Sequence, residues 1–137
     1  MDGDASLRDL ATQAFVGVTE SDSVLGTVRL MHEEGVDRAV VLRGSEPVGV
    51  VSAETVYGLL SEGVDLSDET VGAVMDDAPP TRAADRPPAE ATDALANGAG
   101  AVLVTDDGAL VGTVGARDIV AAGRDATAAV GDAAPAG

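Results

Sequence analysis

Apolar residues recur along the chain first at helical spacing and then at strand spacing. Residues 21–35 carry Val, Leu and Met side chains at helical spacing and end at Gly35, which predicts a helix with a glycine stop. Two apolar runs follow at 38–42 and 48–52, and the turn-forming stretch between them predicts a hairpin. Another helix is predicted directly afterwards, over 53–63. The first half of the chain is therefore expected to form a helix, two strands and a helix.

The second half repeats this order of elements. A short alanine-rich helix, a hairpin with an Asp-Gly turn signal, and a closing helix are predicted over 89–98, 101–114 and 117–130. Each half also begins with a short amphipathic turn, at 6–12 and at 70–76, followed by an extended stretch. The extended stretch of the second half holds two Pro-Pro pairs, which exclude a strand in the interior of a sheet.

The two halves are related by a nearly constant offset, which indicates an internal duplication. Leu7 matches Val71 at an offset of 64 residues, and Gly49 matches Gly112 at an offset of 63. A unit of about 60 residues buries too little surface to be stable alone, so the two copies are expected to pack face to face. The expected organisation is a first repeat over 1–64, a second repeat over 65–126 and a flexible tail over 127–137, with 61–69 as the linker.

The charge balance narrows the range of partners. The chain has 24 acidic and 8 basic residues and a formal net charge of −16, and it contains no lysine. We therefore expect neither a nucleic-acid polymer nor an anionic membrane as a partner, because both are bound through clusters of Lys and Arg. An acidic excess of this size is typical of proteins adapted to multimolar salt, where the screening length falls to roughly 3 Å.

Several kinds of chemistry have no residues to support them. The chain has no cysteine, which excludes disulfides, thiolate zinc sites and thiol catalysis. The acidic N-terminal segment has no apolar run, which predicts neither a signal peptide nor a membrane anchor and favours a cytoplasmic protein. His32 is the only histidine, and its two acidic neighbours indicate a solvated helix surface rather than a catalytic base. The Asp pairs at 76 and 106 lack the spacing of a metal site. Neither an enzyme nor a metal protein is predicted.

One short phrase recurs with complementary changes. The stretches GVVSAETVYG and GTVGARDIVA begin at positions 49 and 112, and both lead from a glycine through an apolar strand into a helix start. The first copy has Ser52 where the second has Gly115, and the second has Asp118 where the first has Thr55. Of a pattern that combines a hydroxyl with a carboxylate, the first copy thus keeps the hydroxyl of Ser52 and the second copy keeps the carboxylate of Asp118.

In these residues the chain resembles a tandem pair of CBS (cystathionine β-synthase) domains, the arrangement called a Bateman module. The most specific part is DDGALVGTVGARDIV, since the family phrase is a glycine, two apolar residues, Ser or Thr, two further residues and Asp. The resemblance covers roughly residues 6–124 and, with the acidic composition, is of haloarchaeal type. It implies an α/β (α+β) fold of two repeats, each a small three-stranded sheet with flanking helices, packed with pseudo-twofold symmetry.

The resemblance implies a regulatory module that binds an adenosine-containing ligand between the repeats: AMP, ADP, ATP or S-adenosylmethionine. In such pairs the Asp of the phrase accepts hydrogen bonds from the ribose hydroxyls, while the Ser or Thr and the backbone hold the sugar and the near phosphate. The candidate ligand-binding residues are then Asp118, Gly115, Val114, Arg117, Thr81, Ser52, Val51 and Arg38. Arg38 and Arg117 are the candidates for one or two phosphates, a triphosphate would require a metal ion, and the expected counterpart of Arg38 in the second repeat is Gly100.

The split phrase leaves two functions open. We expect one usable cleft centred on Asp118 and a weak or empty one centred on Ser52, in a sensor that modulates an unidentified protein partner. In the alternative, Ser52 and Asp118 serve only as helix caps, and Arg38 and Arg117 only reduce the negative charge of the surface. The two repeats are then a ligand-free scaffold for dimerisation or protein contact. For both functions the resemblance implies a homodimer that pairs through helix faces.

Overall fold

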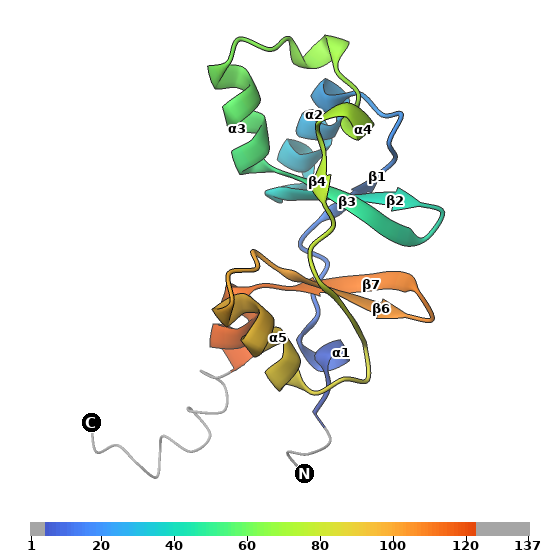
Figure 1. Ribbon diagram of the computed structural model, residues 1–137, viewed down its shortest axis with the longest axis vertical. Coiled ribbons are helices and arrows are strands. Elements are labelled where there is room, and N and C mark those ends of the chain that lie inside the picture. The colour runs from blue at the N-terminus through green and yellow to red at the C-terminus, as the bar shows by residue number, and fades with distance from the viewer. Residues whose placement is uncertain (1–4, 123–137) are drawn as a thin grey trace, which may run out of the picture.

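The structure, a computed structural model, describes residues 5–122 as two stacked halves (Figure 1). Each half is a small sheet with helices on its outer side, and the two sheets face one another at the middle of the molecule. The mixed α+β class and the two-repeat architecture expected from the sequence are confirmed. The tail expected at 127–137 lies outside the described residues, as does the end of the helix expected over 117–130.

The upper sheet in Figure 1 belongs to the first half and has the strand order β1-β2-β3-β4. β1 is parallel to β2, and the other pairs are antiparallel. Its core is built mainly from valine, and Met31 of the covering helix is buried in it. The bounds of these elements are β1 Val16–Val18, α2 Val24–Glu34, β2 Arg38–Arg43, β3 Glu46–Ser52, α3 Ala53–Ser61 and β4 Asp76–Asp77.

The lower sheet belongs to the second half and has the strand order β5-β6-β7. β5 pairs in parallel with β6 only, so the proline-flanked strand lies at an edge, as expected. Asp107 and Gly108 both have positive φ in the turn between β6 and β7, which confirms the Asp-Gly signal. The bounds are β5 Thr81–Ala83, α5 Pro88–Ala96, β6 Val102–Asp106 and β7 Ala109–Val114, and residues 116–122 are helical.

Each half contributes a short helix to the core of the other half. α1 (Leu7–Leu10) lies in the lower half of Figure 1, where Leu7 is fully buried in the cluster that contains Val104. α4 (Val71–Val74) lies in the upper half, where Val71 is fully buried in the first core. Leu7 and Val71, which match in sequence, therefore occupy equivalent places, each in the core of the other half.

The exchanged segments run close against the last strand of each hairpin, and this contact accounts for the leading glycine of the repeated phrase. Asp76 of β4 pairs with β3, and Thr12 forms an isolated bridge to β7. A Cβ atom on Gly49 would lie 2.9 Å from the carbonyl oxygen of Asp76, and one on Gly112 would lie 3.0 Å from that of Thr12. Because these backbone atoms cannot easily move away, both positions require glycine.

The segment between the two repeats packs against the first core, and its continuation adds a strand to the first sheet. The linker expected over 61–69 contains the 3₁₀-helix η2 (Leu66–Asp68), and Leu66 is buried in the first core next to α2. The chain then adds β4 to the edge of the first sheet. That sheet consequently has four strands rather than the expected three.

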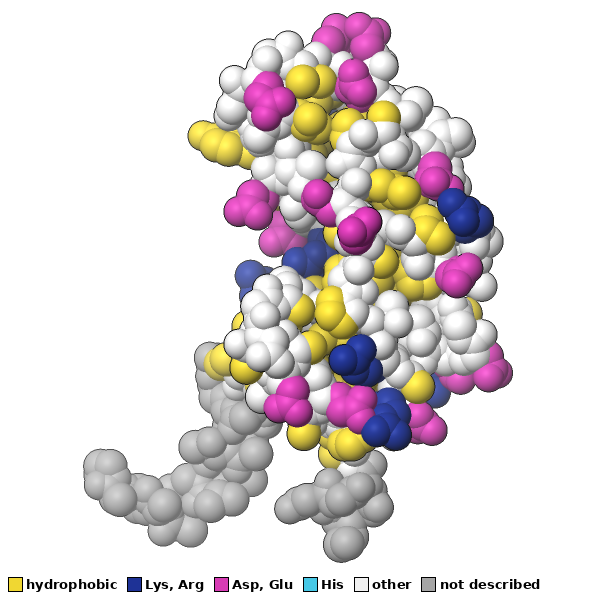
Figure 2. Space-filling view, viewed as in Figure 1, with side chains coloured by type: hydrophobic (Ala, Val, Ile, Leu, Met, Phe, Trp, Pro, Cys, Tyr) yellow, Lys and Arg dark blue, Asp and Glu magenta, His cyan; other side chains and the backbone are white. Residues whose placement is uncertain are grey.

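Acidic side chains are spread over the face of the molecule drawn in Figure 2. Four arginines form ion pairs with acidic residues. Glu90 on α5 accepts a hydrogen bond from Arg86, which holds the pKa of the Glu90 carboxyl below its usual value, and Arg82 approaches the same carboxylate at 3.5 Å. The two other pairs are Arg8–Asp106 and Arg43–Glu20. None of the helices within residues 5–122 is long and apolar enough to cross a membrane.

Candidate functional site

The repeated phrase starts a helix in each half, and its two versions cap that helix in different ways. Ser52 is the N-cap of α3, and its Oγ accepts a hydrogen bond from the Thr55 N–H at 3.2 Å. Gly115 has no side chain, and here the Asp118 Oδ2 accepts from the Gly115 N–H at 2.8 Å instead. These are the two bonds that together make a capping box, so each repeat keeps one half of it. A ligand can therefore be held only by those polar atoms of Ser52 and Asp118 that the capping hydrogen bonds do not use.

A cleft of about 410 Å³ opens between the two halves beside Asp118. The second half contributes Gly115, Arg117 and Asp118 to its lining, and the first half contributes Asp37 and Arg38. Asp118 is half-buried, and within residues 5–122 only its Oδ2 is hydrogen bonded, to the Gly115 N–H. A carboxylate oriented in this way can accept hydrogen bonds from two neighbouring hydroxyl groups, which is the arrangement in a ribose.

Arg38 and Arg117 bring two positive charges to the same cleft. In the described part of the chain, neither guanidinium lies within 4.0 Å of a carboxylate oxygen, in contrast to the four paired arginines. Gly100 borders the cleft, and a Cβ atom there would lie 4.0 Å from the Arg38 guanidinium, so the absent side chain leaves that group open. Figure 2 shows basic side chains at the waist between the halves. Two cations that face one cleft, and that have no acidic partner in the part of the chain the structure describes, indicate a site for an anion.

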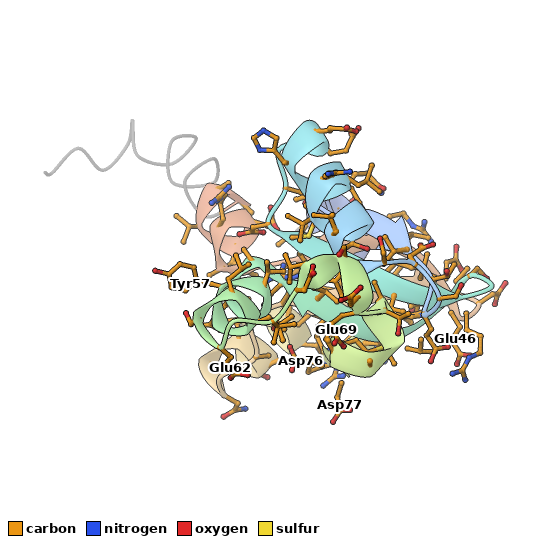
Figure 3. The ribbon with its side chains drawn as sticks, turned by 90° about the horizontal axis from the view of Figure 1, so that it is seen from above. Glu46, Tyr57, Glu62, Glu69, Asp76 and Asp77 are labelled. Atoms are coloured by element: carbon orange, nitrogen blue, oxygen red, sulfur yellow. The ribbon has the colours of Figure 1, made fainter. Side chains whose placement is uncertain are left out.

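The Ser52 end of the first half carries a different cluster. The Thr55 hydroxyl donates to the Asp76 Oδ2 at 2.6 Å, and the Ser52 Oγ lies 3.1 Å from the Thr55 Oγ1. Asp76 comes from β4 and lies beside α3 in Figure 3, whereas its neighbour Asp77 points away from the protein. A carboxylate therefore stands next to the phrase of the first repeat although position 55 is a threonine.

The eight ligand residues expected from the sequence fall into three groups. Four of them line the Asp118 cleft together: Asp118, Gly115, Arg117 and Arg38. Val51 and Val114 are fully buried, so their side chains belong to the two cores. Thr81 is exposed on the edge strand β5, Ser52 caps α3, and neither lines this cleft.

Strand register corrects one correspondence between the repeats. Arg38 lies opposite Ser52 in the first hairpin. The register of the second hairpin places Ala101 opposite Gly115, because the next residues along, at 102 and 114, are paired. The counterpart of Arg38 is therefore Ala101 and not Gly100, which instead faces the Arg38 guanidinium from across the cleft.

Sequence reasoning did not identify Asp37, Gly100 or Asp76 as site residues, and it considered Gly100 only as the counterpart of Arg38. The first two line the Asp118 cleft, and the third is the partner of Thr55. The signal for Asp76 was present in the duplication, because the offset of 64 residues that matches the two short helices also matches Thr12 to Asp76. The sequence alone does not show that the short segments are exchanged between the halves, so it indicates Asp76 only as one of two adjacent acidic residues.

The family model of the CBS domain matches residues 7–62 and again residues 71–125. The chain belongs to the CBS domain family. Its two matches make it a tandem CBS pair, and such a pair is a regulatory, non-catalytic module. No curated protein sequence matches the chain.

Several solved structures share this architecture. An uncharacterised conserved protein from Pyrococcus horikoshii is 25% identical, with a TM-score of 0.76 over 90% of this chain and 96% of that one. A CBS domain protein from Pyrobaculum aerophilum complexed with AMP is 21% identical, with a TM-score of 0.73 over 83% of this chain and 89% of that one. A CBS domain pair in complex with 5′-methylthioadenosine and S-adenosyl-L-methionine is 16% identical, with a TM-score of 0.72 over 86% of this chain and 94% of that one. The ligands of the last two are adenosine derivatives.

Proposed function

We propose that this CBS pair is a regulatory sensor that binds AMP or ADP in the cleft between Asp118 and Arg38. The observation that carries the proposal is the chemistry of the cleft, where a carboxylate fixed by a backbone N–H stands with two guanidinium groups that have no carboxylate partner among residues 5–122. Asp118 accepts from the ribose hydroxyls, and Arg38 and Arg117 hold one or two phosphates. The AMP complex of the Pyrobaculum aerophilum protein supports this ligand class.

The proposed regulatory effect follows from the fact that the cleft residues come from both halves of the molecule. Arg38 comes from the first half, whereas Arg117 and Asp118 come from the second. A nucleotide that contacts both halves binds more tightly when the halves face one another than when they do not. It therefore shifts the equilibrium toward the facing arrangement, by an amount set by the difference between the two affinities. An unidentified protein partner that binds across the two halves then responds to the nucleotide.

The arginines test this assignment directly. Arg38→Gln and Arg117→Gln are each expected to weaken AMP binding about tenfold, because each removes charge-assisted hydrogen bonds to the phosphate. The affinity for adenosine, which has no phosphate, should stay unchanged in both variants. Calorimetric titration in about 2 M KCl measures both ligands with surface charge screened. Arg29→Gln is the matched control, since Arg29 is exposed on α2 and does not line the cleft.

The competing function is a ligand-free scaffold. It is favoured by the capping bonds, because Ser52 and Asp118 both have a structural role without any ligand. The same titrations separate the two functions. Folded wild-type protein that is free of copurified nucleotide, and that shows no heat with AMP or ADP, would contradict the sensor and leave the scaffold.

We also propose that two copies pair through the outer faces of their helices. Tyr57 and Leu60 on α3 are 74% and 54% exposed and border an apolar groove of about 240 Å³ with Val28 and Met31. Figure 3 shows Tyr57 projecting outward from α3. Tyr57→Asp is expected to convert a dimer to a monomer in sedimentation velocity experiments, because it places a charge in an apolar contact. Ser45→Asp, in the exposed β2–β3 turn, should leave the dimer intact.

The acidic composition fits a protein that works in a cytoplasm of high salt. A net charge of −16 on 137 residues repels itself at low ionic strength, and multimolar salt screens this repulsion. A haloarchaeal origin, the cytoplasmic location, the repeat boundary at 64 and 65, and the absence of catalysis in the whole protein stay predictions from the sequence.

A further inference from the structure

We propose that Asn97 is a site of spontaneous chemical modification, where the protein loses ammonia and gains a negative charge, and that the end of α5 controls the rate. Asn97 is the only asparagine in the chain, and Gly98 follows it. Both residues are exposed, and Asn97 is the C-cap of α5. The inference is independent of the proposed nucleotide cleft, because neither residue lines it.

The Asn97-Gly98 pair has the groups that deamidation requires. The Gly98 backbone nitrogen attacks the side-chain carbonyl carbon of Asn97, so that a new C–N bond closes a succinimide ring. The bond from this carbon to the side-chain nitrogen breaks, and ammonia leaves with the proton of the Gly98 amide. Water then opens the ring at one of its two carbonyl carbons and gives aspartate or isoaspartate. Glycine suits this reaction because it has no Cβ atom to hinder the approach of its nitrogen.

The folded backbone holds the Gly98 nitrogen away from the reaction. The Gly98 N–H donates to the Leu95 carbonyl oxygen at 3.1 Å, and the Ala99 N–H donates to that of Ala94 at 3.1 Å. Asn97 has a ψ of 12°, which places the Gly98 nitrogen almost in line with the Asn97 backbone nitrogen and turned away from the Cβ atom. The ring can therefore close only after the bond to Leu95 breaks and ψ of Asn97 rotates, which requires the end of α5 to open.

The last turn of α5 has little to hold it closed. The helix lies on the outer side of the lower sheet (Figure 1), and within Pro88–Ala96 only Ala91 is buried. Its last turn carries no basic side chain that could interact favourably with the negative end of the helix dipole. Helix ends of this kind open locally at a much lower free energy than that of global unfolding. The reactive geometry is therefore reached while the rest of the protein stays folded.

The product weakens the second half of the molecule. A carboxylate at position 97 lies at the negative end of the helix dipole, where a negative charge is unfavourable. Isoaspartate also adds a carbon atom to the backbone, which displaces the Gly98 N–H from the carbonyl that it contacts in the turn. Because Ala91 of α5 is buried in the core that contains Val104, a loosened helix exposes part of that core.

Mass spectrometry of the full chain during incubation at neutral pH in about 2 M KCl tests this site. The replacement of the amide by a carboxylate is followed in the proteolytic peptide that contains residue 97, and Asn97→Gln should abolish it. Folded protein is expected to react at least about tenfold more slowly than the same chain unfolded in guanidinium chloride. Ala96→Gly should accelerate the reaction of folded protein about threefold, because glycine weakens the last turn of α5.

Gly49→Ala is the matched control, since it crowds the Asp76 carbonyl oxygen in the first half and leaves α5 unchanged. It should not alter the rate. Equal acceleration by Gly49→Ala and Ala96→Gly would assign the reaction to global unfolding and overturn the control by α5. A folded chain that stays unmodified while the unfolded chain reacts completely would overturn the site itself, and equal rates in the two states would overturn any protection by the fold.

The effect on stability has its own test. Deamidated protein, separated from unmodified protein by ion exchange, is expected to unfold at a lower denaturant concentration, and Asn97→Asp should reproduce the part that is due to charge. Equal unfolding midpoints for the modified and unmodified chains would contradict the weakening of the second half.

Discussion

Replacing Asp118 by alanine is expected to weaken AMP binding at least about 100-fold, because two charge-assisted hydrogen bonds to the ribose, each worth about 1.5 kcal/mol or more, are lost together. Calorimetric titration of AMP measures the change. The variant also loses the bond from the Gly115 N–H, which costs about 1 kcal/mol of stability as for other helix caps. That cost is small enough for the protein to stay folded.

Two further variants separate ligand binding from helix capping. Asp118→Asn keeps an oxygen that can accept from the Gly115 N–H but removes the negative charge. It should therefore keep its stability while AMP affinity falls. Asp93→Ala, at an exposed position of α5, removes an equal charge elsewhere and should leave AMP affinity unchanged. An unchanged affinity in Asp118→Ala would place the nucleotide outside this cleft.

The glycine that leads each copy of the repeated phrase is expected to be essential for stability. Gly112→Ala would place a methyl group 2.8 Å from the Ala11 Cβ and 3.0 Å from the Thr12 carbonyl oxygen, and Gly49→Ala would clash similarly with Asp76. Overpacking of this kind costs about 1–3 kcal/mol for each substitution. Denaturant unfolding at constant high salt should show a lower midpoint for each variant and a larger loss for the double variant.

Gly58→Ala provides the matched control for these two variants. Gly58 lies within α3, and a Cβ atom there would have no neighbour within 4 Å. The substitution should stabilise the protein by about 0.5–1 kcal/mol, because alanine is the better helix former. If Gly49→Ala and Gly112→Ala behaved like Gly58→Ala, the close backbone approach would not be a constraint on the fold.

Elements with local signals were predictable from the sequence, whereas their mutual packing was not. Gly35 ends α2 with positive φ, and the Asp107-Gly108 pair makes the second hairpin turn, as their residue types predict. The apolar pattern around Leu7 and Val71 shows that each short helix buries one face, but not which sheet receives it. The exchange between the halves is set by chain geometry that no short stretch of sequence encodes.

The same distinction applies to the Asp118 cleft and to the hydrogen-bonded cluster of Ser52, Thr55 and Asp76. Asp118 and Arg117 belong to one contiguous phrase, so the sequence placed them together, and the resemblance added Arg38. Asp76 is 21 residues from Thr55, and the two meet only because β4 crosses to the first sheet. Asp76 reaches Thr55 only because the strands are exchanged, so no spacing within the sequence marks the pair. Only the constant offset between the two repeats indicates the position of Asp76.

The exchanged short helices are also expected to make the two halves of the described chain unfold together. If the halves separated, each sheet would lose a fully buried side chain from its core, Leu7 from one and Val71 from the other. Unfolding of one half therefore removes part of the core of the other, which is the condition for a cooperative two-state transition. A nucleotide bound in the proposed cleft would add its binding free energy to that single transition. The melting temperature of the whole protein would then rise with nucleotide concentration, although the cleft touches only a small part of either half.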